Sequence, residues 1–230
     1  GALTLTAATL GSGETEIRRL APLEPGSVDL TLNAGSGDLT LTDNSRVNSA
    51  GALVLGSDEG SVVLTRGSRA QAATDATLTA ATDVSVNLSS SVEAGEGDLT
   101  LTATDGDLSV TSGGSLVAGN DLTGTAGQNV TLDQSTADAG GDLSLDAQGA
   151  DLTLTNSRAT AATDLDLRAK GDLTVDHSEV RATDGDMSLT ASDGDLAVRQ
   201  DSTLTAGNDL TADAGNDLSI ADTTVRAEGA

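Results

Sequence analysis

Aspartate recurs at intervals that could place one carboxylate in every layer of a repetitive structure. One uninterrupted series, spaced by 21–23 residues, contains Asp75, Asp98, Asp121, Asp142, Asp164, Asp186 and Asp209. Carboxylate oxygens suit Ca²⁺, so a row of cation sites is one interpretation. A Ca²⁺ site needs several convergent oxygens, however, and each layer offers one carboxylate of this series. We therefore favour a turn role, in which each Asp accepts the backbone N–H two residues further on.

Catalytic groups were sought among the remaining polar residues. His177 is the single histidine, and it aligns with Asn156, Gln134 and Asp222 of other repeats, which favours a polar stack over a catalyst. Polysaccharide lyases and hydrolases on β-helices use acidic clusters, but sugar binding there normally involves aromatic faces, and the chain has no aromatic residue except that histidine. Successive repeats are nearly the same, whereas catalysis needs one distinct site. The sequence predicts no catalytic, cofactor-binding or metal-binding residues and no cofactor. We therefore expect that the protein is not an enzyme.

Threonine pairs suggest a different surface function. The pairs Thr77/Thr79, Thr100/Thr102 and Thr123/Thr125 fall in three successive repeats. Ice-binding solenoids present such arrays, so an ice-binding or a Ca²⁺-stabilised solenoid is kept as an alternative. Val54 precedes this array, and Asp166 and Arg168 follow it, which leaves a short plane. Thr is also an ordinary outward residue of strands.

The elements that position these residues follow from a repeat of about 22 residues. One series of strand phrases begins at Asp29, Ala52, Asp75, Asp98, Asp121, Asp142, Asp164, Asp186 and Asp209. A second begins at Asp38, Ser61, Asp83, Asp107, Asn129, Asp151, Asp172, Asp195 and Asp217. Each phrase alternates apolar and polar residues, as in a strand with one buried face. Of the 36 inward positions, 33 hold Val, Ile, Leu or Met, and the exceptions are Ala76, Gly124 and Ala212.

A weaker third strand occupies the longer interval of each repeat. It is centred on Val47, Ala70, Val92, Leu116, Ala137, Ala159, Val180, Leu204 and Val225. Three short strands per turn, each paired with its equivalent one turn along, define an all-β, parallel β-helix (β-solenoid) of about 22 residues per coil. By analogy with parallel crossovers we expect it to be right-handed. Such a stack predicts an exterior covered by polar side chains and without a pocket.

The repeat is interrupted near the amino terminus. Residues 1–10 are predicted to end a preceding coil, with Ala2 to Ala7 as its second strand and a third strand ending at Leu10. Residues 11–26 contain both prolines and are predicted to be an inserted loop or short helix, or else a contact surface for a partner. Residues 27–230 are predicted to form a nine-coil rod, which we interpret as a fragment of a longer protein.

Composition excludes several classes of partner. The net charge of −25 and the eleven scattered basic residues argue against nucleic acid and anionic membrane surfaces. No apolar run is long enough to span a bilayer, so membrane insertion is not expected. The chain lacks cysteine, which excludes disulfides and thiolate metal sites.

The phrases between Ala118 and Ser157, with the recurrent pattern Ala-Gly-x-Asp-Leu-x-Leu-x-Ala, resemble the repeat region of filamentous haemagglutinin-like exoproteins. These are the two-partner secretion proteins that include adhesins and contact-dependent inhibition proteins. The family's amino-terminal secretion signature and a toxin-like carboxy-terminal module are not seen.

The resemblance implies a structural or adhesive rod of a large bacterial exoprotein that is secreted or held at the cell surface, associated with the outer membrane. The implied partners are an outer-membrane transporter during export and a receptor on a host or neighbouring cell. In such proteins the rod holds an adhesive or toxic tip away from the cell.

Overall fold

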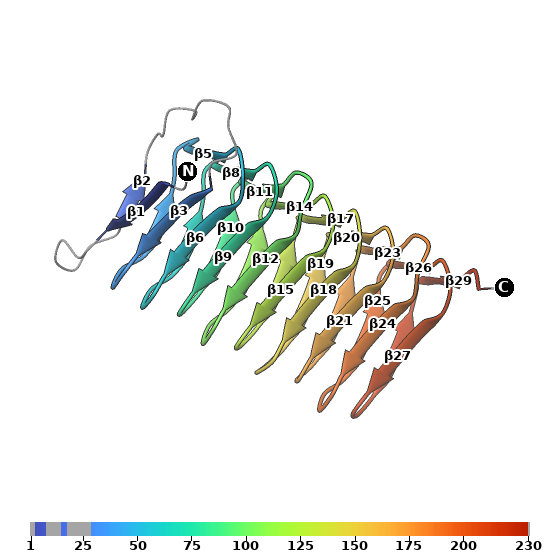
Figure 1. The fold of residues 1–230 in the computed structure, drawn as a ribbon. Helices are drawn as coiled ribbons and strands as arrows, with labels where there is room; N and C mark the ends of the chain where they lie inside the picture. Colours follow the sequence, from blue (N-terminus) through green and yellow to red (C-terminus); the bar gives the residue numbers. More distant parts are fainter. Residues whose placement is uncertain (1–2, 8–14, 18–28, 230) are drawn as a thin grey trace.

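The computed structural model describes residues 3–7, 15–17 and 29–229. These residues form 29 strands and no helix, arranged as three parallel sheets around one long axis (Figure 1). We call the sheets A, B and C in the order in which the chain visits them. The all-β, three-stranded parallel β-helix predicted from the sequence is confirmed.

Sheet A contains β1 (Leu3–Ala7), β3 (Leu30–Ala34), β6 (Leu53–Ser57), β9 (Ala76–Ala80), β12 (Leu99–Ala103), β15 (Leu122–Ala126), β18 (Leu143–Ala147), β21 (Leu165–Ala169), β24 (Met187–Ala191) and β27 (Leu210–Ala214). Sheet B contains β2 (Thr15–Ile17), β4 (Leu39–Leu41), β7 (Val62–Leu64), β10 (Val84–Asn87), β13 (Leu108–Thr111), β16 (Val130–Asp133), β19 (Leu152–Thr155), β22 (Leu173–Asp176), β25 (Leu196–Arg199) and β28 (Leu218–Ala221).

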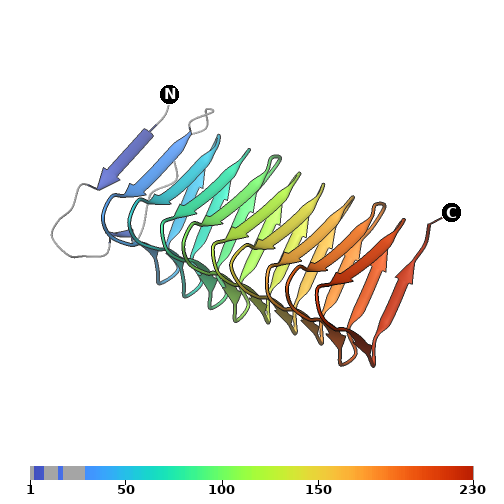
Figure 2. The ribbon, with the colours of Figure 1, turned by 90° about the horizontal axis from the view of Figure 1, so that it is seen from below.

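Sheet C contains β5 (Arg46–Ser49), β8 (Arg69–Ala72), β11 (Ser91–Ala94), β14 (Ser115–Ala118), β17 (Thr136–Ala139), β20 (Arg158–Ala161), β23 (Glu179–Ala182), β26 (Thr203–Ala206) and β29 (Thr224–Ala227). One coil is one strand from each sheet, so coil 1 is β3–β4–β5 and coil 9 is β27–β28–β29. The coils follow one another along a single direction (Figure 2), and at about 4.8 Å per step the nine coils span about 40 Å.

The strands pair in register from coil to coil, so equivalent side chains form continuous stacks. Leu99 of β12 pairs with Leu122 of β15, as the sequence predicts, and the same register holds throughout sheet A. The inward positions of coils 1–8 are buried almost completely. Because the alternation of the sequence has a period of two, the strands of coils 1–8 place most of their aliphatic residues inside and most of their Ser, Thr and Asp residues outside.

Gly124 interrupts the leucine stack on the inner face of sheet A. A Cβ atom built on Gly124 would lie 2.7 Å from Leu108 Cδ2 and 2.7 Å from Leu145 Cδ2. The tips of these two leucines therefore occupy the space that a side chain at position 124 would need. The side chains of Leu108 and Leu145 therefore fill the space that the missing side chain of Gly124 would otherwise leave empty.

The last coil has one uncovered face. Leu218, Ile220 and Val225 are 41–50% exposed, although equivalent residues of the inner coils are buried. Each side chain in the stack is covered by the coils on both sides of it, and β27, β28 and β29 have a neighbour on one side in this structure.

The amino-terminal assignment requires a correction. The strand Leu3–Ala7 was predicted to be a second strand, but β1 pairs with β3 and therefore belongs to sheet A. Its apolar alternation fits either sheet, since both have the same period. The third strand predicted to end at Leu10 lies outside the described residues, as does most of segment 11–26. Its described residues, Thr15–Ile17, form β2 and pair with β4, so the predicted short helix does not run through them.

Candidate functional site

The aspartates that open the strands bond between coils and not within their own turns. In the series on sheet A, Oδ1 of one Asp accepts the backbone N–H of its counterpart in the next coil, as between Asp121 and Asp142 at 2.9 Å. The same bond joins Asp75 to Asp98, Asp98 to Asp121, Asp142 to Asp164, Asp164 to Asp186, and Asp186 to Asp209. Each of these aspartates accepts a backbone N–H, as predicted, but the predicted donor two residues further on in the same turn is wrong. The backbone carbonyls of the same aspartates accept N–H groups of the preceding coil, as Asp142 does from Leu122 at 2.8 Å, so the carboxylate bond adds to the backbone pairing of adjacent coils.

A second ladder of the same kind opens the strands of sheet B, and it contains a natural amide. Asp107 Oδ1 accepts the N–H of Asn129 at 3.0 Å, and Asn129 Oδ1 accepts the N–H of Asp151 at 3.1 Å. An uncharged amide oxygen therefore occupies the same place in the ladder as a carboxylate oxygen. In the first ladder, hydrogen bonds from the Thr163 hydroxyl and the Asp164 N–H lower the pKa of Asp142, so the stabilisation from this carboxylate is present at neutral pH and lost on acidification.

Replacing one member of the ladder should separate hydrogen bonding from charge. We expect Asp121→Ala to lower the free energy of unfolding by about 1 kcal/mol, because the N–H of Asp142 loses its protein acceptor. Asp121→Asn should stay within about 0.5 kcal/mol of the parent, since an acceptor oxygen remains. Urea unfolding followed by circular dichroism measures both changes. An equal loss in the two variants would show that charge, and not the acceptor, matters.

The ladders do not assemble a metal site in the described part of the chain. No group of three or more His, Cys, Asp or Glu side chains that could hold a metal ion occurs among residues 3–7, 15–17 and 29–229. One carboxylate oxygen in each ladder bond is already used by the backbone.

The outer face of sheet A carries the threonine pairs in register. Thr77, Thr100 and Thr123 align in one row, and Thr79, Thr102 and Thr125 align in a second row. Val54 precedes the first row and Asp146 follows the second, as the register of β6 and β18 shows. The array is therefore three coils long. Ice binding stays a prediction, which thermal hysteresis of a solution of the chain near its freezing point would test.

Asp166 is the least well solvated acid on this face. Its Oδ1 is buried without a hydrogen-bond partner, and its other oxygen pairs with Arg168 of the same strand. Burial raises the pKa of Asp166, and Arg168 offsets this in part. A raised pKa means that the folded state binds the proton more tightly than the unfolded chain, so ionised Asp166 destabilises the fold at neutral pH.

Asp166→Asn should consequently stabilise the protein at pH 7, by about 0.5–1 kcal/mol. The advantage should shrink as the pH falls through the range in which the carboxyl group takes up its proton. Thermal melts between pH 3 and pH 7 measure this trend. Asp193→Asn is the control, because it removes one negative charge from an exposed turn. A gain of the same size and pH dependence in the control would contradict the role of burial.

The corner between sheets B and C, which we call the B–C corner, is built on a ladder of buried serines. Its members are Ser45, Ser68, Ser90, Ser135, Ser157, Ser178 and Ser202. Ser157 is representative: its Oγ donates to the Thr155 carbonyl at 2.8 Å and accepts the N–H of Ser135 at 3.2 Å. This ladder was not predicted from the sequence, although each serine lies two residues before the centre of a third strand.

The B–C corner is shorter in three successive coils than in the coils that flank them. It spans residues 112–114 in coil 4 and 200–202 in coil 8, but residues 134–135, 156–157 and 177–178 in coils 5–7. The longer corners carry two residues with positive φ, such as Ser112 and Gly113, and the shorter ones carry one. One residue fewer draws the surface inward, so coils 5–7 form the floor of a shallow, open groove that is flanked by coils 4 and 8.

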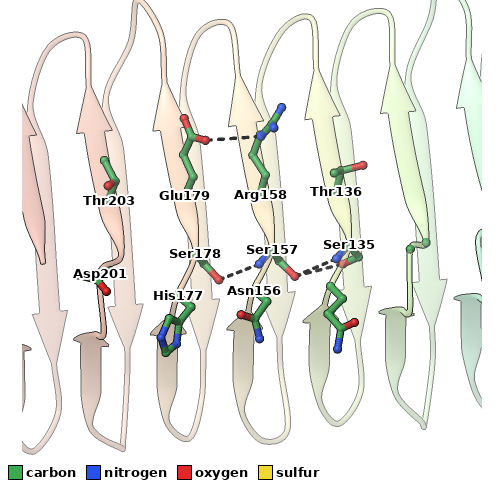
Figure 3. A pocket seen from close by; sticks show the side chains of 13 residues that line it. Ser135, Thr136, Asn156, Ser157, Arg158, His177, Ser178, Glu179, Asp201 and Thr203 are labelled. Carbon is green, nitrogen blue, oxygen red and sulfur yellow. Dashed lines mark hydrogen bonds and ion pairs between the residues drawn. The ribbon is translucent and has the colours of Figure 1, made fainter. Parts of the chain in front are cut away.

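This groove has a volume of about 600 Å³ and is lined by polar residues and glycines. Figure 3 shows three rows of side chains along it. One row holds Thr136, Arg158, Glu179 and Thr203, a second holds Ser135, Ser157 and Ser178, and Asn156 and His177 lie on the far side of the serines. Gln134 and Asp201 also line the groove. The repeat pattern predicts an exterior without a pocket, and this prediction is wrong at the B–C corner. The signal in the sequence was the interval from the opening residue of the second strand phrase to the centre of the third strand. This interval is eight residues in coils 5–7, as from Asn129 to Ala137, and nine in coils 4 and 8, as from Asp107 to Leu116.

His177 takes its place in the polar stack predicted for it, next to Asn156 of the preceding coil. Its Nδ1 lies 2.7 Å from Asp176 Oδ1, and Arg199 Nε lies 3.0 Å from Asp176 Oδ2. Burial alone would raise the pKa of Asp176, but the hydrogen bonds from Arg199 and His177 hold it below its ordinary value. Because an ionised carboxylate only accepts, His177 Nδ1 donates to it.

These features define a β-solenoid repeat protein with an acidic, hydrogen-bonded exterior. Residues 128–194 match the family model described as Hemagglutinin repeat. This stretch runs from β16 to β24 and includes the floor of the groove. Together with the fold it confirms the resemblance to filamentous haemagglutinin-like repeats. Such repeats are generally non-enzymatic and imply a secreted or surface exoprotein.

No curated protein and no solved structure matches the chain. Within the described residues, no helix is long and apolar enough to cross a membrane.

Proposed function

We propose that this chain is a spacer segment in the rod of a large bacterial exoprotein, where it holds an adhesive or toxic tip at a distance from the cell. The observation that supports this role is the unbroken in-register stacking of nine coils. Each coil contacts its neighbours alone, so the length of such a rod is set by the number of coils. The hemagglutinin repeat match supports the same class of protein.

The physical properties of the chain suit export and exposure. A chain without cysteine passes a transporter pore without forming disulfides, and contacts between adjacent coils let folding propagate from one end outside the cell. The net charge of −25 keeps an extended rod soluble and opposes association side by side. An outer-membrane transporter during export and a receptor on a host or neighbouring cell are the partners that this role requires.

Antibody labelling of intact cells of the source organism tests the location. The proposal expects the chain at the surface or in the medium, where added protease removes it. Detection in permeabilised cells only would overturn it.

The spacer role itself is tested with a reach assay. The chain is placed between a surface anchor and a receptor-binding domain, and the height of that domain above the membrane is measured by fluorescence energy transfer to a membrane dye. Duplicating two internal coils should raise the domain by about 10 Å. An unchanged height in a folded, duplicated chain would contradict the role.

A further inference from the structure

We infer that the two aspartate ladders make the rod a fold that responds to ionic strength: it is stable in saline solution and opens in dilute solution. The inference goes beyond the spacer role and is independent of it, because a rod can space a tip at whatever salt concentration it folds. Three observations support it, namely the spacing of the ladder carboxylates, the lack of ion pairs to them among the described residues, and the uneven charge of the coils.

Folding brings the ladder carboxylates close together. Successive ladder aspartates are 21–24 residues apart in the sequence, which corresponds to about 25 Å in a flexible unfolded chain. In the rod they occupy equivalent positions of adjacent coils, about 4.8 Å apart along the axis. In ten such pairs the carboxylate of one aspartate accepts the N–H of the next, and this bond holds each carboxylate beside its neighbour. Folding therefore places ten pairs of like charges at one strand spacing.

The basic residues do not neutralise these carboxylates. Arg66, Arg158, Arg168, Arg199 and Arg226 each pair with an acid outside the ladders. No ladder aspartate forms an ion pair with another described residue. The repulsion is therefore left to dissolved ions, whose screening distance is about 30 Å at 10 mM ionic strength and about 3 Å at 1 M. Carboxylates one strand spacing apart repel fully at the first concentration and weakly at the second.

The charge is concentrated in coils 3–9. Residues 75–229 contain 28 acidic and six basic residues, a net charge of −22, whereas residues 29–74 contain five acidic and three basic residues, a net charge of −2. Both ladders are interrupted in coil 2, where Ala52 and Ser61 take the places of aspartates. From coil 3 onward the rod carries one net charge per about 1.5 Å of its axis, close to the about 1.7 Å of B-DNA, which retains a condensed layer of counterions.

Urea unfolding in NaCl solutions from 10 mM to 1 M, followed by circular dichroism, tests the inference, because urea is uncharged and leaves the ionic strength unchanged. We expect the urea midpoint to rise by about 1 M or more over this range. KCl should give the same rise, since screening depends on ionic strength and not on the identity of the cation. A midpoint that stays constant or falls would overturn the inference. So would a rise in NaCl that KCl does not reproduce, because bound sodium would then explain it.

A double variant links the response to the ladders. Asp121→Asn with Asp186→Asn removes two charges and four of the ten ladder pairs but keeps an acceptor oxygen at each position. We expect its midpoint to rise about a third less with salt than that of the parent. The matched control, Asp133→Asn with Asp138→Asn, removes the same charge from positions whose partners in register are uncharged, and its rise should stay within about a tenth of the parent's. Equal reductions in the two variants would contradict the role of the ladders.

The opposite change should strengthen the response. Ala52→Asp with Ser61→Asp fills the interruption in coil 2 and joins the first aspartate of each ladder to the rest. We expect the midpoint of this variant to lie below that of the parent at 10 mM NaCl and to rise by about a third more on going to 1 M. An unchanged or smaller rise would show that adjacent carboxylates do not set the response.

Discussion

Leu145→Ala is expected to be among the most destabilising single truncations in the rod, with a loss of about 4–5 kcal/mol in the free energy of unfolding. Leu145 is fully buried on β18 and pairs with Gly124 of β15. Its Cδ2 fills part of the space next to Gly124. Truncation therefore removes the buried methyl groups and also opens the space at the glycine, so the cavity is larger than at an ordinary position.

Leu167→Ala is the matched control for this prediction. Leu167 is equally buried on β21, but its partners in register are Leu145 and Leu189. We expect it to lose about 2–4 kcal/mol, and Leu145→Ala at least about 1 kcal/mol more, in urea unfolding at one temperature. Equal losses would mean that the leucines next to Gly124 do not compensate for the missing side chain.

Gly124→Leu should destabilise the protein by about 1–3 kcal/mol, although it restores the residue type that the repeat prefers. Leucine at this position would collide with Leu108 Cδ2 and Leu145 Cδ2, each 2.7 Å from the site of a Cβ atom. Ala212→Leu is the contrasting change to the same consensus. Ala212 lies on β27 and is partly buried near the uncovered face, so we expect it to be neutral or stabilising.

The double variant Gly124→Leu with Leu145→Ala provides a stricter test. The new leucine should fill the cavity left at position 145, so the double variant should be more stable than the sum of the two single losses predicts. Thermal melts of the four proteins in this cycle give the coupling energy. Additive losses would show that the two positions do not share one space.

The regular part of the fold was predictable because three levels of the sequence agree. Alternation with a period of two identifies the strands, the interval of about 22 residues sets their stacking, and alanines fit the crowded third sheet. The pairing of Leu99 with Leu122 follows from these rules. The sheet of β1 does not, because a single apolar alternation suits any of the sheets and the following segment departs from the repeat.

The candidate site was less predictable, because it results from a one-residue difference in corner length and not from a recognisable motif. Coils 5–7 lack one residue at the B–C corner, and the resulting groove depends on how that deletion moves the surface relative to coils 4 and 8. Residue types alone drew attention to His177 but gave no reason to group it with Arg158 or Asp201. The aspartate ladders were found by type, yet their donors lie in the next coil, about 22 residues away, and sequence proximity pointed to the wrong partner.

The central claim is that one coil advances the chain by one strand spacing along a single axis, and electron paramagnetic resonance distances test it most directly. The chain has no cysteine, so spin labels can be attached at pairs of introduced cysteines on the outer face of sheet A. The pairs Thr102→Cys with Thr190→Cys, Thr79→Cys with Thr190→Cys, and Thr79→Cys with Asp213→Cys are separated by four, five and six coils. We predict distances of about 19, 24 and 29 Å, rising by one strand spacing per coil. Distances that do not increase in equal steps with coil number would contradict the solenoid and the spacer role that depends on it.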